Sequence, residues 1–225
     1  MGNMFKTSIG KKLIMSLAGI FLLSFLVVHL AINLLIVIYP DSRDPFNLAA
    51  HFMATNPIIK IMEITLFGGF ILHMIYGVVI SIQNMIARGN VRYKVGNNSQ
   101  LSFFSKYMIH TAVIVSVFIV IHLIDFYINS KFLHGAESVT INGKDVHDMG
   151  LLVIQKFKIL PYSVFYIFAL LILAFHLHHG FQSAFQTLGI NHKTYTPVIK
   201  ALGVLYSVIV PLGFILIPVY VYFFL

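Results

Sequence analysis

The histidines of this chain are the residues whose number and spacing could do chemistry. There are 11 of them, against 7 acidic residues and no cysteine. Without thiolates the chain cannot form a disulfide, ligate an iron–sulfur cluster or attach haem covalently, so imidazole is its main potential metal ligand. The densest group lies in HLHHGFQSAFQ, where His176, His178 and His179 follow a long apolar run. Any chemistry of these imidazoles is therefore expected inside a membrane.

The elements that must position these histidines are long apolar helices. Hydrophobic residues make up 59% of the 225 residues and charged residues only 10%, whereas a soluble domain is about a quarter charged. A bilayer core needs roughly 20 apolar residues per helix. We predict an all-α membrane protein, one domain over 1–225, with five transmembrane helices, the first four forming the bundle that holds the histidines, at about 13–39, 58–87, 107–129, 161–188 and 201–225.

The distribution of basic residues predicts the direction of the chain. An N-terminus in the cytoplasm puts nine Lys and Arg on the inner side and six on the outer side, which favours N-in and C-out. The first apolar run lacks a small-residue cleavage site, so we interpret it as a retained span rather than a signal peptide. The outer loop 130–160 contains VTINGKDV, where Asn142-Gly143 predicts a small hairpin with a type I′ turn.

Four consecutive spans each carry a histidine in their apolar part: His29, His73, His122 and His176. An ionisable residue inside a membrane is costly, and four in consecutive spans point to a function. The remaining loop histidines are expected on solvated surface: His51, His134, His147 and His192.

The sequences around these histidines resemble one another in alternating spans. FLVVHLAIN around His29 matches FIVIHLIDF around His122, and both His73 and His176 are followed by Gly at +4 and Gln at +10. Residues i and i+4 lie on the same helix face, so a glycine there leaves a shallow groove beside the imidazole. This pattern fits the face of a porphyrin and suggests a duplicated two-helix unit.

The glycine spacing selects one histidine of the cluster. Only His176 has a glycine at +4, Gly180, so we predict it as the ligand. His178 and His179 are expected to make hydrogen bonds to neighbouring helices, haem propionates or buried water.

Motif and depth together predict the pairing. His29 and His122 lie closer to the outer charged residues than His73 and His176 do. We therefore predict an outer haem iron bound by His29 and His122, and an inner one bound by His73 and His176.

These motifs, in this order, resemble the dihaem, five-helix cytochrome b that anchors succinate dehydrogenase and fumarate reductase in the membrane. The most specific parts are FLVVHLAIN, LHMIYG, FIVIHLIDF and HLHHGFQSAFQTLG followed by NHKTYTP, and the resemblance covers most of the chain. It implies two haem b groups on the same four histidines. It also implies a location in the bacterial cytoplasmic membrane and a role in respiratory complex II.

The resemblance further implies partners. A flavoprotein subunit with FAD and an iron–sulfur subunit would bind on the cytoplasmic side, and dicarboxylate chemistry would occur there. This chain would be the quinone-reactive subunit of the enzyme, with menaquinone as the expected quinone. Some members carry a carboxylate two residues before the last ligand, but that position here is Ala174. Glu63 is the quinone-site candidate, with the alternative that it is an interfacial residue paired with Lys60; Asp125 is the other acid near a span.

Two other functions are consistent with intramembrane histidines. One is the cytochrome b subunit of a different quinone-linked oxidoreductase, such as a hydrogenase or formate dehydrogenase. The other is a transporter with a histidine-lined metal or proton path. Transporters more often show charged residues or broken helices near the midplane, so this alternative is the weaker one.

Overall fold

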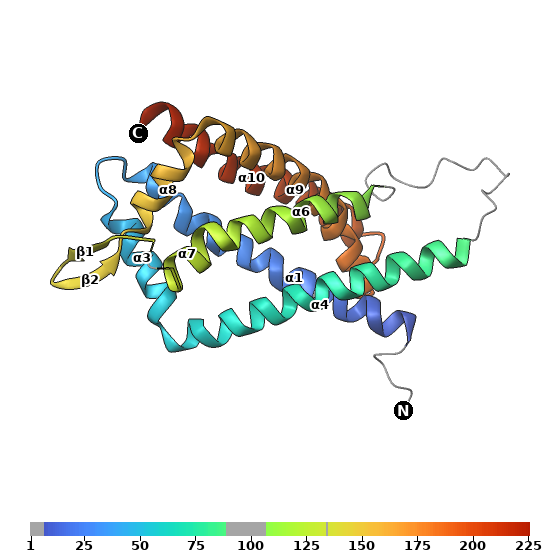
Figure 1. The fold of residues 1–225 in the computed structure, drawn as a ribbon. Helices are drawn as coiled ribbons and strands as arrows, with labels where there is room; N and C mark the ends of the chain where they lie inside the picture. Colours follow the sequence, from blue (N-terminus) through green and yellow to red (C-terminus); the bar gives the residue numbers. More distant parts are fainter. Residues whose placement is uncertain (1–6, 89–106, 134) are drawn as a thin grey trace.

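The computed structural model describes residues 7–88, 107–133 and 135–225, and it is dominated by five long helices (Figure 1). Each is long and apolar enough to cross a membrane. The prediction of an all-α membrane protein with five spans is confirmed. The five spans are built on α1 (Ser8–Asn33), α4 (Pro57–Arg88), α6 (Met108–His122), α9 (Leu160–Thr187) and α10 (Tyr195–Phe224). The first span continues beyond α1 to Ile38 and the third continues beyond α6 to Lys131.

Two spans begin earlier than their apolar runs. Thr7 caps α1, where its side chain accepts a hydrogen bond from the Gly10 N–H, so the helix includes the basic residues before Leu13. The last span begins at Tyr195 rather than 201, after a turn in which Gly189 has φ 77°. Polar first turns of a membrane helix lie in the interface, and hydropathy alone does not report them. Four of the basic residues in the charge count lie outside the described residues: Lys6, Arg92, Lys94 and Lys106.

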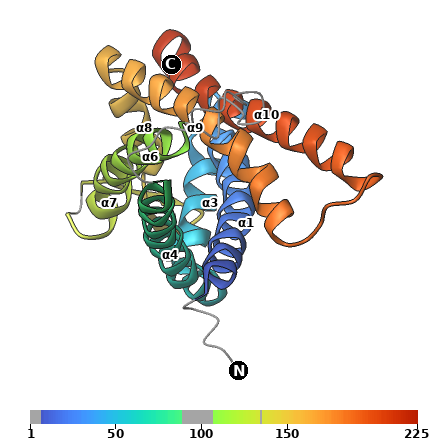
Figure 2. The same cartoon turned by 90° about the vertical axis from the view of Figure 1, so that its right-hand side faces the viewer.

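The first four spans form a ring. Neighbours around the ring are α1 and α4, α4 and α6, α6 and α9, and α9 and α1. Within the described residues, the diagonal helices α1 and α6 are not closely packed, and neither are α4 and α9. α10 lies outside the ring against α9 and α1, and Figure 2 views the arrangement roughly end-on. The ring therefore has an interior that only side chains cross.

The third span changes geometry directly after its histidine. The α-helix α6 ends at His122 and continues as a π-helical segment η1 (Leu123–Ile128), followed by the short α7 (Asn129–Lys131). π-helical turns are rare and occur frequently at functional sites. This one changes the directions of the side chains between His122 and the end of the span.

One end of the molecule carries small elements outside the spans (Figure 1). The first span ends in α2 (Leu35–Ile38), and α3 (Asp44–Thr55), β1 (Ser138–Ile141), β2 (Lys144–His147) and α8 (Met149–Phe157) follow. We call this the hairpin end. The predicted hairpin is confirmed: β1 and β2 are antiparallel, and both turn residues have positive φ, 52° at Asn142 and 74° at Gly143, as a type I′ turn requires.

The helix α3 was not predicted from the sequence. The segment was expected to be a loop, but Pro45 occupies the first turn of a 12-residue helix, a position where its missing N–H costs nothing. His51 therefore lies on a helix and is partly buried, which corrects its placement on a loop. His147 and His192 are exposed as expected, and His134 lies outside the described residues.

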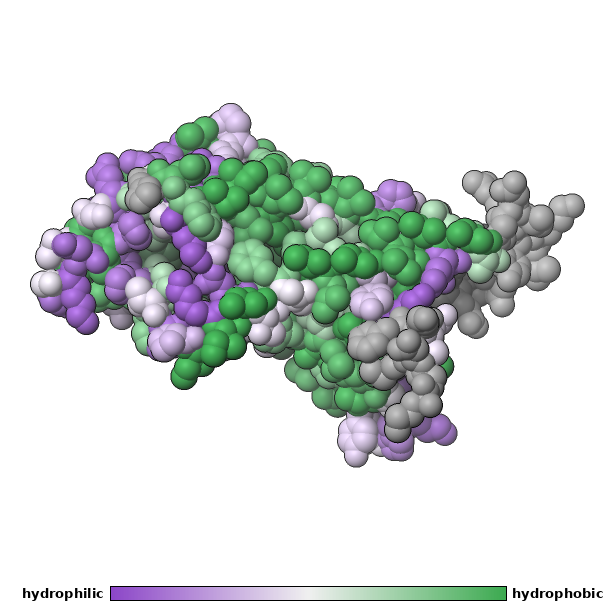
Figure 3. All heavy atoms as spheres, turned by 60° about the horizontal axis from the view of Figure 1, so that its bottom comes forward, coloured by the Kyte–Doolittle hydropathy of each residue, from purple (hydrophilic) through white to green (hydrophobic). Residues whose placement is uncertain are grey.

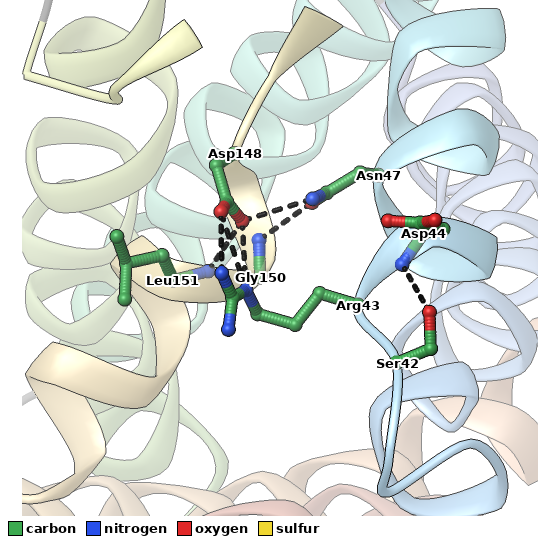
Figure 4. A network of polar contacts seen from close by, with 7 residues as sticks. All are labelled: Ser42, Arg43, Asp44, Asn47, Asp148, Gly150 and Leu151. Atoms are coloured by element: carbon green, nitrogen blue, oxygen red, sulfur yellow. Dashed lines mark hydrogen bonds and ion pairs between the residues drawn. The ribbon is translucent and has the colours of Figure 1, made fainter. Parts of the chain in front are cut away.

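A buried carboxylate joins α3 to α8 (Figure 4). Asp148 caps α8 at the Leu151 N–H, 2.9 Å away, and accepts hydrogen bonds from Asn47 at 2.9 Å and from the Arg43 guanidinium at 2.9 and 3.2 Å. Burial by itself raises the pKa of Asp148, but the hydrogen bonds from Arg43 and Asn47 outweigh it and the pKa lies below its ordinary value. The same contact raises the pKa of Arg43. This cluster fixes the hairpin end on the bundle.

The surface shows the division expected of a membrane protein. Figure 3 shows hydrophobic side chains along the middle of the molecule and hydrophilic ones gathered at the hairpin end. Large apolar residues are exposed along every span, such as Ile64, Val113 and Phe168. These surfaces fit contact with lipid chains rather than water.

Candidate functional site

The four predicted histidines lie in two pairs on diagonally opposite helices. His29 of α1 and His122 of α6 have ring centroids 5.8 Å apart. His73 of α4 and His176 of α9 have centroids 6.4 Å apart. The structure thus brings together the same two pairs that the sequence motifs suggested. Each pair crosses the interior of the ring between helices whose backbones are not closely packed.

The two pairs lie at different depths. A side chain at Gly19 would come within 3.4 Å of the His73 ring, so His73 is level with that part of α1. His29 is ten residues further along the same helix, which is about 15 Å at 1.5 Å per residue. The pair His29 and His122 is therefore the one nearer the hairpin end.

Both separations suit two imidazoles on one metal ion. Metal–imidazole bonds of about 2 Å place the centroids of two rings on opposite sides of a metal roughly 6 Å apart. The ring planes are inclined at 85° and 74°, so neither pair is stacked face to face. All four side chains are only partly buried by protein. Each of these residues therefore keeps some surface that the described protein does not cover.

Hydrogen bonds at Nδ1 set the tautomer of the inner pair. His73 Nδ1 lies 3.2 Å from the Met15 carbonyl, which only accepts. His176 Nδ1 lies 3.3 Å from the Thr111 hydroxyl, whose own proton is donated to the Met108 carbonyl at 2.8 Å. Both Nδ1 atoms therefore donate, and the lone pair of each neutral imidazole is on Nε2. Metal-binding histidines commonly bond through the other ring nitrogen in this way.

The outer pair has similar contacts. His122 Nδ1 lies 3.4 Å from the Tyr166 hydroxyl, and His29 Nδ1 lies 3.4 Å from the Asn33 carboxamide. Aromatic rings hold both imidazoles in place: Phe25 stacks on His29 at 5.2 Å, and Phe126 packs on His122 at 5.3 Å. For His73, His122 and His176 the contact made by Nδ1 leaves the lone pair of Nε2 for a ligand. The atom beside His29 Nδ1 is the Asn33 NH2 nitrogen, which is itself a donor, so this contact does not assign the proton of His29.

The glycines at +4 leave space beside the inner pair. A Cβ at Gly77 would meet no neighbouring side chain within 4 Å, and one at Gly180 would meet only the end of Met108, at 3.7 Å. Among the described residues, no close packing against a neighbour requires a glycine at either position. Open space next to an imidazole is what a flat ligand would occupy.

These observations fit haem better than a bare metal ion. In the described part of the chain, no three His, Asp or Glu side chains gather to hold a metal. A haem iron needs only axial ligands from the protein because the porphyrin supplies the rest. Two facing imidazoles in each pair and open space at Gly77 are consistent with that requirement.

The other two histidines of the cluster make different contacts. His178 Nδ1 lies 3.4 Å from the Ser207 hydroxyl of α10, outside the ring. His179 follows His178 on α9 and is partly buried. The contact of His178 with a neighbouring helix is of the kind expected from the sequence.

Glu63 forms a polar cluster near the hairpin end. Its carboxylate accepts hydrogen bonds from Lys131, at 2.7 Å, and from the Tyr127 hydroxyl, and Lys131 also contacts Tyr127 at 2.7 Å. The ion-pair partner of Glu63 is thus Lys131 and not Lys60, which the alternative interpretation of Glu63 had paired with it. Lys60 is on the same helix, whereas η1 and α7 bring Tyr127 and Lys131 across from the third span.

Several residues of these sites were not identified from the sequence. Thr111, Tyr166 and Asn33 contact the histidines, and Tyr127 and Lys131 contact Glu63. The i, i+4 spacing of Tyr127 and Lys131 shows that they share a helix face. Nothing in the spacing identifies the side chain that they face.

Comparison with known proteins gives no relative: no protein-family model, no curated protein and no solved structure matches this chain.

Proposed function

We propose that this chain is the dihaem cytochrome b membrane anchor of a succinate:quinone oxidoreductase. It would carry electrons between the iron–sulfur clusters of a partner subunit and a membrane quinone. The observation that supports this proposal most is that two histidine pairs on diagonally opposite helices lie at different depths of one bundle. The ring centroids are 5.8 Å apart in one pair and 6.4 Å apart in the other. The sequence motifs that resemble this family contain the same four histidines.

Haem, when bound, would supply one-electron redox chemistry at each pair. His29 and His122 would hold one iron and His73 and His176 the other. The Nδ1 contacts would fix each ring and influence its basicity, which tunes the potential of a bound metal. Bis-histidine ligation would leave no open position on either iron.

The proposed orientation places the hairpin end outside the bacterial cytoplasmic membrane and the N-terminus in the cytoplasm. The distribution of basic residues supports it. The flavoprotein and iron–sulfur subunits would then bind at the opposite end, near the pair His73 and His176.

The Glu63 cluster is the proposed quinone site. It combines a carboxylate, a hydroxyl and an ammonium group near the hairpin end of α4, and the side chains of Glu63 and Lys131 are 21% and 37% exposed. These groups could donate and accept protons when a quinone is oxidised or reduced. The aromatic ring of Phe67 lies against Tyr127 at 5.2 Å and would offer a flat apolar contact.

The proposal is tested by purifying the tagged chain from its native membranes in mild detergent. A flavoprotein and an iron–sulfur protein should co-purify, and succinate should reduce the b haems. The same preparation from the His176→Ala variant should show loss of one haem. Co-purification with a hydrogenase or formate dehydrogenase instead would support the other oxidoreductase, and absence of haem would refute both.

A further inference from the structure

A chain of hydrogen bonds leads from His122 to the hairpin end. His122 Nδ1 lies 3.4 Å from the Tyr166 hydroxyl, which lies 2.8 Å from the Tyr162 hydroxyl. Tyr162 donates to Asp125 at 2.9 Å, and Lys156 of α8 contacts the other oxygen of Asp125 at 2.5 Å. Four helical segments, α6, η1, α8 and α9, contribute these residues.

Each hydrogen bond between His122 and Asp125 can be assigned one donor and one acceptor. A carboxylate beside an ammonium group is ionised and only accepts, so the single hydroxyl proton of Tyr162 is donated to Asp125. The Tyr166 hydroxyl must then donate to Tyr162, and its oxygen accepts from His122 Nδ1–H. Consecutive hydrogen bonds that point the same way polarise one another, most strongly where the dielectric constant is low.

The other three histidines have no such connection within the described residues. His73 donates to the carbonyl of Met15, and His176 reaches a carbonyl through Thr111. His29 contacts a neutral carboxamide. Among these four histidines, and within the part of the chain that the structure describes, only the contacts of His122 continue to a negatively charged group.

We propose that Tyr166, Tyr162 and Asp125 are positioning residues that make His122 a stronger electron donor to its metal. The inference rests on the proposed function, because it concerns the iron bound by His29 and His122. An imidazole whose Nδ1–H is drawn toward an anion has more negative charge on the ring. More negative charge favours ferric over ferrous iron and lowers the reduction potential of that haem.

The test is a spectroscopic redox titration of the purified complex and of its Tyr166→Phe variant. The substitution removes one hydroxyl and keeps the ring that packs against Phe118 and Phe157. We expect one haem to become easier to reduce, with about a tenfold change in its ferrous-to-ferric ratio at a fixed potential, which is about 59 mV for one electron. The other haem is the internal control and should not change.

Two more variants separate electronic from purely structural effects. Tyr162→Phe and Asp125→Asn do not alter a group in hydrogen-bond contact with His122, so a purely local role of Tyr166 predicts no change in either. We expect both to shift the same haem in the same direction, by less than Tyr166→Phe does. Tyr206→Phe, which removes a hydroxyl bonded to the Leu23 carbonyl, should change neither haem.

The outcomes are distinguishable from failure of the proposed function. Wild-type protein without haem would refute both ideas. Wild-type protein with two haems, but with both midpoints unchanged in Tyr166→Phe, would overturn this inference alone. A shift in Tyr166→Phe that is absent in both Tyr162→Phe and Asp125→Asn would also overturn it, because the chain to the carboxylate would then have no effect.

Discussion

The open space at Gly77 gives a prediction whose sign depends on the proposed ligand. Apart from the nearby backbone of α4 itself, no atom lies within 4 Å of a Cβ placed there. In the protein alone, Gly77→Leu therefore starts from a Cβ position that no neighbouring side chain occupies, and we expect it to be accommodated. It should also stabilise α4 by roughly 0.5–1 kcal/mol, because glycine is a poor helix former and leucine a good one. With a flat ligand against His73, the same side chain would occupy the space of that ligand.

The expected result is selective loss of one haem. Gly77→Leu should reduce the haem content from about two to about one per chain, and the remaining spectrum should belong to the pair His29 and His122, about 15 Å away along α1. A pyridine haemochrome assay on purified protein, normalised to protein concentration, measures this. Expression and thermal stability of the haem-free chain should not fall.

Gly68→Leu is the matched control on the same helix. Gly68 also has no atom within 4 Å of its side-chain position. It lies five residues before His73, about 140° around the helix from the imidazole at 100° per residue. This variant should keep both haems. If Gly77→Leu also keeps both, with an unchanged spectrum, then no ligand lies in this space and the reasoning is wrong.

Three further predictions concern separate parts of the molecule. His176→Ala should remove one haem by absorption spectroscopy while His178→Ala keeps both, and the reverse result would show that the wrong histidine was chosen. Glu63→Gln should reduce quinone turnover at least tenfold while both haems remain, because the substitution removes a carboxylate that can take up and release a proton. Unchanged turnover would exclude this cluster as the quinone site. Asp148→Ala should cost about 1–3 kcal/mol, since it removes the cap of α8 and leaves the buried Asn47 amide without its partner, and thermal unfolding in detergent would measure this. Because the pKa of Asp148 is lowered in the folded protein, its contribution is present above the pKa of the unfolded chain and should be lost as pH falls through the folded pKa.

The spans, the hairpin and the histidine pairs follow from local patterns. Apolar length predicts the five helices, and the Asn142-Gly143 dipeptide predicts the turn because both residues must have positive φ. The pairing of His29 with His122 came from matching motifs. The spans and the turn are each encoded in one short stretch, whereas the pairing needs a comparison of two stretches and of their depth.

The residues that contact His122 and Glu63 from other helices could not be predicted in the same way. Tyr166 reaches His122, and Lys131 reaches Glu63, across helices that are far apart in the sequence. Their contacts depend on helix rotation and on the π-helical segment η1, neither of which a hydropathy pattern reports. The helix α3 was missed because its apolar content is too low and its length too short for a span.

Haem content is the most direct test of the central claim, that the two diagonal histidine pairs are axial ligands. The measurement is a pyridine haemochrome assay together with a dithionite-reduced minus oxidised spectrum of the purified chain. We predict a b-type spectrum and about two haems per chain. A single haem would contradict the assignment of two pairs, and the absence of any b-type signal would contradict the proposed function itself.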